Sequence, residues 1–361
     1  MLPTHIQPKV SQTTQENPLL EVRDLRVSFH LDEGVLRAVE GVSFDIQPGQ
    51  VLGIAGESGC GKTVTALSIL RIIPPPGRID SGQILFNHRG DDHNWSGNTV
   101  IDMALLDPRG KQIREIRGKE IAMIFQEPMS SFSPLHTIGS QIIEAIMLHR
   151  DLGKKAARSM AIDLLAKVGI PNPAQRVDQF PHEFSGGMRQ RAMIAMALSC
   201  NPALLIADEP TTALDVTIQA QILKLMMDLQ KEFGMAIIFI THNLGVIAQI
   251  ADEVAIMYLG KVAEKGPTRE IFHHPKHPYT INLLRAIPTI DGTSGKPLYS
   301  IEGLVPNPFE RPNGCSFNPR CEHRITGQCE MEVPGSRSVG PGHSTACFLY
   351  ENNESMDTDA S

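Results

Sequence analysis

The stretch that most constrains the fold of this chain is a glycine-rich loop between an apolar run and a helical pattern. The apolar run is 51–55, and the helical pattern after the loop ends before three consecutive prolines. A strand, a glycine loop, a Lys-Thr pair and a helix, in this order, are typical of a phosphate-binding (Walker A) loop. The residues of this predicted nucleotide site are Gly56, Glu57, Ser58, Gly59, Cys60, Gly61, Lys62 and Thr63.

The chemistry of this loop suits a nucleoside triphosphate. Its glycines let backbone N–H groups turn towards an anion, and the helix N-terminus adds a partial positive charge. Lys62 is expected to reach the β- and γ-phosphates, and Thr63 is expected to hold Mg²⁺. The alternative is a glycine-rich turn that carries a Lys-Thr pair by chance.

Composition restricts the class of protein. The chain has 361 residues, of which 41% are hydrophobic and 20% charged, as in soluble globular proteins, and it can form two domains or one large domain with an appendage. The net charge of −7 provides no basic field, so no nucleic-acid partner is predicted. The polar N-terminus lacks a signal-peptide core and no apolar stretch reaches 18 residues, so the protein is expected in the cytoplasm and is not expected to span a membrane by itself.

Hydrophobic periodicity predicts an α/β core with additional antiparallel strands beside it. Alternating patterns indicate half-buried strands, continuous apolar runs indicate strands buried on both faces, and a helix-rich region separates two of the runs. The half-buried strands are 20–29, 42–46 and 84–86; the buried strands are 121–125, 204–207 and 236–240; the helix-rich region is 139–200; and a hairpin is expected at 254–262. Disordered tails are expected at 1–18 and 351–361, and a surface insertion at 87–97.

Polar residues end three of the predicted buried strands. They are Gln126, the pair Asp208-Glu209, and His242. Because ligands of open α/β sheets bind at the carboxyl ends of the strands, these side chains are expected to meet around one phosphate group. Asp208 would hold Mg²⁺, mainly through water, and Glu209 would polarise the attacking water as a general base. Each residue alone is an ordinary strand-end or surface group, so the prediction depends on their combination with the phosphate loop.

A second anion site is predicted where Ser185, Gly186 and Gly187 open a helix. This segment resembles the signature of the ATP-binding cassette (ABC) family, usually Leu-Ser-Gly-Gly-Gln, with Phe184 and Met188 at the outer positions. The resemblance covers residues 19–266. It implies a P-loop NTPase of the ABC type with a mixed sheet core, an antiparallel β-subdomain and a helical subdomain at about 127–202. It also implies ATP hydrolysis by two cassettes, each ATP lying between the phosphate loop of one and the signature of the other.

The family pattern implies roles for further residues. Phe29 matches the aromatic residue that stacks on adenine, and Asp215 matches the loop that crosses between subunits. Gln126 matches the loop that senses Mg²⁺ and couples to membrane partners. Among the strand-end residues, Asp208 and Glu209 match the metal-binding acid and catalytic base, and His242 matches the histidine at the γ-phosphate.

Beyond residue 266 the chain becomes proline-rich. The segments 276–280, 314–315 and 318–321 resemble the tail of oligopeptide- and dipeptide-import ATPases, so 267–350 is expected to be an extension of that type. The resemblance implies the first of two paired ATPase subunits, at the cytoplasmic face of the inner membrane. Implied partners are a second cassette, identical or different, two transmembrane permease subunits and an external solute-binding protein. The solute class stays open between peptides, nickel and oligosaccharides.

The predicted extension holds four of the six cysteines, Cys315, Cys321, Cys329 and Cys347. Four thiols in a segment with little apolar content indicate a structural metal site. Their spacing matches neither a Cys-x2-Cys zinc pattern nor a standard ferredoxin pattern. Because similar importer subunits carry a 4Fe–4S cluster here, that cluster is the preferred interpretation, with Zn²⁺ or four unliganded thiols as alternatives.

Two other functions compete with transport. A cassette ATPase acting on chromosomes or ribosomes would need a long coiled coil between Lys62 and Ser185, or a second phosphate loop, and the sequence has neither. The other is an iron–sulfur redox protein in which ATP is regulatory, but no flavin or second redox motif is evident.

Overall fold

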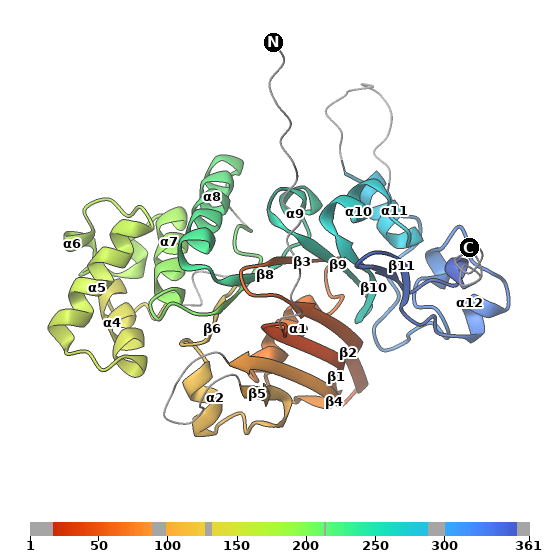
Figure 1. Cartoon of the computed structure of the whole chain (residues 1–361), viewed down its shortest axis with the longest axis horizontal. Coiled ribbons are helices and arrows are strands. Elements are labelled where there is room, and N and C mark those ends of the chain that lie inside the picture. The colour runs from red at the N-terminus through yellow and green to blue at the C-terminus, as the bar shows by residue number, and fades with distance from the viewer. Residues whose placement is uncertain (1–16, 89–98, 127–131, 213, 288–299, 352–361) are drawn as a thin grey trace, which may run out of the picture.

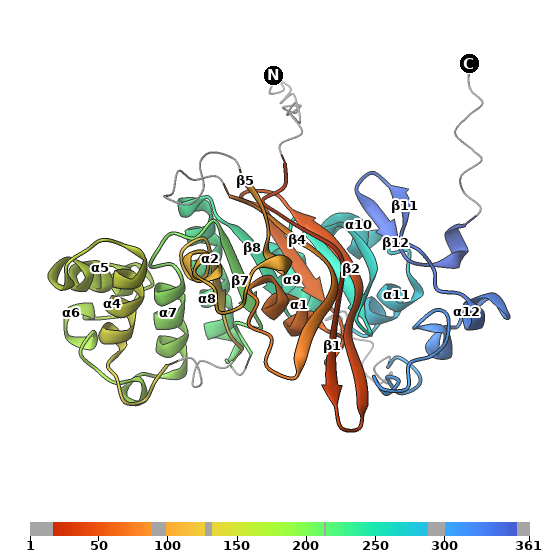
Figure 2. The same cartoon turned by 90° about the horizontal axis from the view of Figure 1, so that it is seen from below.

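A computed structural model describes residues 17–88, 99–126, 132–212, 214–287 and 300–351. The predicted tails at 1–18 and 351–361 and the predicted insertion at 87–97 lie almost entirely outside these residues. A group of helices lies at one end of the molecule, two sheets lie in the middle, and the C-terminal segments lie at the other end (Figures 1 and 2).

The larger sheet forms the core of the fold and has eight strands among the described residues. Five of them are parallel neighbours, in the order β9 (Glu253–Tyr258), β3 (Val51–Ala55), β8 (Ala236–Ile240), β7 (Leu204–Asp208) and β6 (Ile121–Ile124). Residues of β3, β7 and β8 are buried throughout, which explains why these segments read as continuous apolar runs. The predicted hairpin is present, because β10 (Lys261–Pro267) pairs antiparallel with β9.

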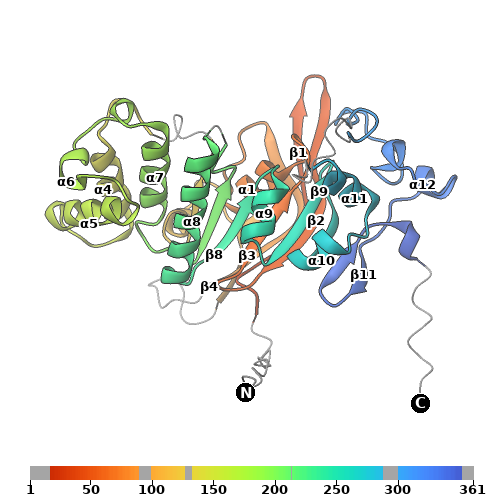
Figure 3. The ribbon, with the colours of Figure 1, turned by 90° about the horizontal axis from the view of Figure 1, so that it is seen from above.

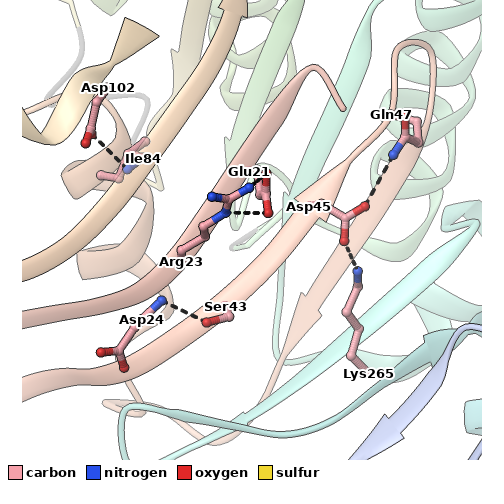
Figure 4. A network of polar contacts seen from close by, with 9 residues as sticks. All are labelled: Glu21, Arg23, Asp24, Ser43, Asp45, Gln47, Ile84, Asp102 and Lys265. Atoms are coloured by element: carbon pink, nitrogen blue, oxygen red, sulfur yellow. Dashed lines mark hydrogen bonds and ion pairs between the residues drawn. The ribbon is translucent and has the colours of Figure 1, made fainter. Parts of the chain in front are cut away.

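The smaller sheet is antiparallel. Its order is β2 (Gly34–Ile46), β1 (Leu20–Leu31), β4 (Gly77–His88) and β5 (Thr99–Asp102). The predicted strands are correct in type but shorter than the observed ones. On β1, Val22 pairs with Phe44 on one side and Ile84 on the other, and all three face one core with the larger sheet. Lys265 Nζ lies 2.6 Å from Asp45 Oδ1 and joins β10 to β2 (Figure 4).

Helices between β6 and β7 lie at one end of the molecule and share a hydrophobic core with one face of the larger sheet and with the helix at Val216–Phe233. They are α4 (Ile138–His149), α5 (Lys154–Lys167), α6 (Pro173–Arg176) and α7 (Gly186–Ala197). Thr137 caps α4 by accepting a hydrogen bond from Ser140 N. The helix-rich region was therefore predicted correctly.

Other helices lie against the sheets. They are α1 (Lys62–Ile69), α2 (Lys111–Ile116), α8 (Val216–Phe233) and α9 (Leu244–Ile250); Figure 3 shows α8 and α9 over the larger sheet. None of the helices in the described parts of the chain has the length and apolarity that crossing a bilayer requires.

The C-terminal segments extend the larger sheet. They contain α10 (Thr268–His273), α11 (Pro278–Arg285), α12 (Gln328–Met331), β11 (Arg337–Gly340) and β12 (His343–Thr345). Strand β12 pairs with β10, and β11 pairs with β12. Tyr279 and Phe317 are fully buried beside Tyr258 of β9, with ring centroids 4.6 and 5.3 Å from that of Tyr258. The C-terminal extension was expected to have little apolar content, so this aromatic core shared with β9 was not predicted.

A buried carboxylate fixes the connection between these segments. Glu264 of β10 accepts hydrogen bonds from the backbone N–H groups of Lys276 and His277, at 2.7 and 2.8 Å. Its Oε1 also lies 2.7 Å from Nε2 of His343, a residue of β12. One side chain therefore holds α11 and β12 against the sheet.

Candidate functional site

The glycine loop connects β3 to α1, as the sequence predicts, and two glycines are required by close backbone approaches. A Cβ on Gly56 would lie 2.1 Å from the carbonyl oxygen of Met257. Gly61 has φ +100° and precedes α1, and a Cβ there would lie 2.4 Å from the carbonyl oxygen of Ala38. The loop therefore fits tightly between β9 and β2, and only glycine fits at these positions.

Lys62 points into the concave side of the loop. Its Nζ donates hydrogen bonds to the carbonyl oxygens of Gly56 and Glu57, at 2.8 and 3.0 Å, and lies 3.7 Å from Cys60 Sγ. Cys60 is buried, and burial raises the pKa of its thiol although nearby Lys62 opposes that shift. The loop therefore presents one buried ammonium and a neutral thiol.

A cavity of about 470 Å³ lies in front of the loop. This volume is in the usual range for a small-molecule site. Phe29 of β1 lines it together with Ser58, Gly59, Gly61, Lys62, Thr63, Gln126 and Glu209, which the sequence placed at one site. Pro308 and Arg311 of the C-terminal segment also line it, and sequence reasoning missed them because no local pattern marks them.

Thr63 and Asp208 meet beside this cavity. Asp208 is the last residue of β7, its side chain is buried, and it is hydrogen bonded to the Thr63 side chain. Within the described part of the chain its Oδ1 has no hydrogen-bond partner, and burial raises the pKa of the carboxyl group. A buried carboxylate oxygen left without a partner beside a hydroxyl is a donor set that fits Mg²⁺.

Glu209 is held by three side chains. Its Oε2 accepts hydrogen bonds from Thr212 Oγ1 at 2.8 Å and Gln126 Nε2 at 3.3 Å, and its Oε1 lies 3.1 Å from His242 Nδ1. Partial burial alone would raise the pKa of Glu209, but the bonds to His242 and Thr212 lower it below its usual value. The strand-end residues predicted to meet therefore do meet.

Glu209 also has an unusual backbone conformation. Its φ is +46°, in the left-handed region that residues with side chains rarely adopt. Its N–H donates to the carbonyl oxygen of Ile240, at 2.9 Å. Such strain is common at functional sites, where the surrounding structure maintains it.

The Ser-Gly-Gly segment lies elsewhere. Ser185 caps α7, with Oγ accepting from Met188 N at 3.4 Å, and Gly186 and Gly187 form the first turn of the helix. Asp215 caps α8 and accepts from Ile218 N at 2.9 Å. Ser185, Gly186, Gly187 and Asp215 are not among the residues that line the cavity at the phosphate loop. One copy of the chain therefore presents the two predicted anion sites on separate surfaces.

The four C-terminal cysteines converge. All of them line one small pocket with about 10 Å³ of free volume. Burial raises the pKa of the Cys347 thiol to about 11, and it also raises the pKa values of Cys315 and Cys321. Within the residues that the structure describes, however, no group of three or more His, Cys, Asp or Glu side chains is arranged to hold a metal ion. The structure thus groups the four cysteines in one pocket but does not arrange them as the predicted iron–sulfur or zinc site.

Known proteins resemble the chain in both sequence and fold. A family model described as "ABC transporter" matches residues 39–212, and one described as "Oligopeptide/dipeptide transporter, C-terminal region" matches residues 263–329. The dipeptide transport ATP-binding protein DppD of Bacillus subtilis is 46% identical over 92% of this chain and 95% of its own length. The oligopeptide transport ATP-binding protein OppD of the same organism is 49% identical over 88% and 85% of the two chains.

Solved structures show the same fold. The cassette MJ0796 in a dimeric post-hydrolysis state with ADP and Pi aligns with a TM-score of 0.58 at 23% identity, covering 69% of this chain and 99% of that one. The cbiO1 subunit from Clostridium perfringens also aligns at 0.58, with 27% identity and coverage of 72% and 92%. The phosphate-loop architecture, the two sheets and the sequence relationship lead to one conclusion: the chain belongs to the ATP-binding cassette family, in the group that carries the oligopeptide/dipeptide transporter C-terminal region.

Proposed function

We propose that this chain is the ATP-binding and ATP-hydrolysing subunit of an importer for dipeptides or oligopeptides. The observation that carries the proposal is the convergence of Lys62, Thr63 and Glu209 at one cavity, with Asp208 hydrogen bonded to Thr63 beside it, in a chain related to DppD and OppD over most of its length. This relationship does not favour a chromosome- or ribosome-bound ATPase, nor a redox protein with regulatory ATP.

The cavity gives each residue a defined task in hydrolysis. The triphosphate would lie on the loop with Lys62 at its β- and γ-phosphates, and adenine would lie against Phe29. Thr63 and Asp208 would hold Mg²⁺, which neutralises charge on the phosphates during transfer; Gln126 is assigned to the same ion by family resemblance. Glu209, with its lowered pKa, is ionised at neutral pH and can accept a proton from the attacking water. His242 orients that carboxylate and would reach the γ-phosphate.

Hydrolysis would require two cassettes. The Ser185–Gly187 segment opens helix α7 and can bind an anion, yet it lies outside the cavity of its own chain. We therefore assign it to the ATP bound by a second cassette, identical or different, with Asp215 at the crossing point. The dimeric state of the solved MJ0796 cassette is consistent with this arrangement.

Coupling to transport would use the helical part. Three exposed apolar side chains lie in this part of the chain. Leu135 lies between Gln126 and α4 in the sequence, and Met147 and Leu148 are on α4. They would contact two permease subunits, which places the protein at the cytoplasmic face of the inner membrane and links it to an external solute-binding protein. In this proposal residues 19–266 form the cassette, with a helical subdomain at about 127–202, and 267–350 form the extension.

The cysteine pocket would hold a structural 4Fe–4S cluster, with Zn²⁺ as the alternative. Its support is the shared pocket of Cys315, Cys321, Cys329 and Cys347. The observed geometry would have to open to admit either group. Iron, sulfide and zinc analysis of anaerobically purified protein tests the proposal, and a protein free of all three would refute it.

Reconstitution tests the transport function. The chain would be co-expressed with the permease and ATPase subunits encoded beside it, and the complex would be reconstituted in proteoliposomes. ATP would be supplied on the side of the bilayer that the ATPase subunits face. Peptide-stimulated ATP hydrolysis and uptake of labelled di- or oligopeptides are expected. Hydrolysis that responds to nickel or an oligosaccharide, but to no peptide, would overturn the peptide assignment while leaving the ATPase intact.

A further inference from the structure

One arginine of the C-terminal segment forms an ion pair with the phosphate loop. Arg320 Nη1 lies 2.7 Å from Glu57 Oε2, and Arg320 Nη2 lies 3.1 Å from Glu57 Oε1. The two residues are 263 positions apart in the sequence. Such a two-pronged pair fixes the orientation of both side chains, and it does so more strictly than a single contact.

Arg320 is itself held rigidly. Its side chain is only 3% exposed, and its guanidinium lies 5.8 Å from the ring centre of Tyr258 and 6.0 Å from that of Phe317. Its Nε donates to the carbonyl oxygen of Glu302, and its Nη1 donates to Tyr258 Oη at 3.4 Å. The orientation of the arginine is therefore fixed by the aromatic core as well as by its contact with the loop.

A second residue from the same part of the chain holds the backbone of Glu57. Tyr279 is buried, and its Oη accepts a hydrogen bond from Glu57 N at 3.0 Å. The carbonyl oxygen of Glu57 in turn accepts from Lys62 Nζ at 3.0 Å. Glu57 thus connects the C-terminal aromatic core directly to the lysine of the phosphate site.

Arg311 makes a similar connection on the other side of the cavity. It donates to Leu259 O at 2.7 Å and to the carbonyl oxygen of Arg37, and Nη1 lies 2.6 Å from Glu40 Oε2. Because Arg37 lines the nucleotide cavity, the C-terminal segment contacts that site at two places.

We propose that Arg320 is a positioning residue for ATP binding, which acts through Glu57 to hold the phosphate loop in its anion-binding shape. This inference rests on the ATP binding proposed above. A loop fixed in advance does not have to be ordered when the ligand arrives, so the pair lowers the cost of binding. The chemical step uses Thr63, Asp208 and Glu209, none of which touches Arg320. The pair should therefore affect ATP affinity more than the turnover rate at saturating ATP.

Nucleotide binding by the full-length chain tests the proposal. Affinity for MgATP would be measured calorimetrically in a Glu209→Gln background, which prevents turnover during the experiment. We expect Arg320→Gln to weaken binding by about tenfold, as for loss of a charge-assisted pair, with Arg320→Lys intermediate because it keeps the charge but not the fork. With Glu209 intact, kcat at saturating ATP should stay within about threefold of the original while KM rises, the signature of lost binding.

Glu57→Gln approaches the same contact from the loop and changes one atom of the side chain. It should also weaken MgATP binding. The Kd of the double variant should be no higher than that of the single variant that binds less tightly, because both substitutions remove the same interaction. Arg337→Gln is the matched control, since Arg337 pairs with Glu351 at 3.0 Å in the same C-terminal segment. It should leave affinity unchanged.

Several results would overturn the inference. These are wild-type affinity in folded Arg320→Gln and Glu57→Gln, additive losses in the double variant, or an equal loss in Arg337→Gln. If Arg320→Gln does not fold, Glu57→Gln, which leaves Arg320 and its aromatic surroundings intact, decides the question. Failure of the unmodified chain to bind MgATP would instead overturn the proposed function, so the two failures can be told apart.

Discussion

Glu209 Oε1 lies 3.1 Å from His242 Nδ1, and this contact joins the ends of two neighbouring parallel strands. Strands β7 and β8 pair in register, with Asp208 opposite Ile240, so the residues that follow them are placed side by side. The Glu209 side chain is 14% exposed and that of His242 is 61% exposed. The carboxylate is therefore enclosed, while the imidazole faces the open side from which a second cassette would approach.

Replacing Glu209 with glutamine should separate ATP binding from hydrolysis. The amide keeps the size of the side chain but cannot accept a proton from water, so kcat should fall by about 100-fold or more while MgATP affinity stays near wild type. Phosphate release and calorimetric binding measure the two properties. Glu232→Gln, which changes an exposed carboxylate paired with Lys167, is the control and should retain full turnover. Near-normal hydrolysis by Glu209→Gln would remove Glu209 as the general base.

Replacing Lys62 with alanine should abolish tight ATP binding. The ammonium lies inside the loop and donates to Gly56 O and Glu57 O, so it is already placed where phosphate oxygens would bind. Loss of charge-assisted hydrogen bonds of this kind should raise the Kd for MgATP by about 30-fold or more. Lys224→Ala removes an exposed lysine of α8 and should have no effect. Unchanged affinity in Lys62→Ala would place the triphosphate elsewhere.

Acid should destabilise the C-terminal segments through His277. This residue is fully buried, its Nδ1 accepts from Tyr279 N at 3.0 Å, and burial lowers its pKa to about 4. As the pH falls below about 6.5, the unfolded chain binds a proton at this position and the folded protein does not. Stability is therefore lost between pH 6.5 and pH 4, by about 2 kcal/mol at pH 5.

The measurement compares urea unfolding of the wild type and His277→Asn at pH 7 and pH 5. Asparagine keeps an acceptor at the start of α11 but does not titrate, so the wild type should lose about 2 kcal/mol more than the variant on acidification. His273→Asn, at an exposed position of α10, should behave like the wild type. Parallel losses in wild type and His277→Asn would show that His277 is not the group responsible.

Cys347 should react slowly with alkylating agents in the reduced, metal-free protein. Burial raises its pKa from an ordinary value of 9.0 to about 11, and only the thiolate reacts. At pH 8 the thiolate fraction should be about 100-fold smaller than in urea-unfolded protein, and the rate should still be rising at pH 10. Peptide mass spectrometry after timed iodoacetamide treatment reports this residue separately. A rate that levels off near pH 9 would contradict the raised pKa of this half-buried thiol.

Much of the candidate site follows from local sequence patterns. The residues Lys62, Asp208, Glu209 and His242 each follow an apolar run, and parallel pairing of those runs necessarily gathers their ends at one edge of the sheet. The placement of Ser185 away from the phosphate loop of its own chain was implied by the resemblance to the ABC family, in which the signature of one cassette meets the ATP of the other. Only the gathering of the strand-end residues follows from strand order and the rule that ligands lie beyond strand ends.

The contribution of the C-terminal segment was not predictable in the same way. Pro308, Arg311 and Arg320 belong to no helix or strand longer than one turn, and Arg320 meets a partner 263 residues away. Strand β12 has three residues, too few to produce a periodic signal. Their positions depend on tertiary contacts with Tyr258 and Glu40, which no single stretch of sequence encodes.

The pairing of β12 with β10 has a practical consequence for shortened versions of the protein. A chain that ends at Pro267 would lack β12, so β10 would become an unpaired edge strand. Its backbone amides and carbonyls could then pair with strands of other molecules. It would also take away the neighbours that bury Glu264. Such a truncated chain should self-associate. Its aggregation would not show whether the remaining residues are sufficient for ATP hydrolysis.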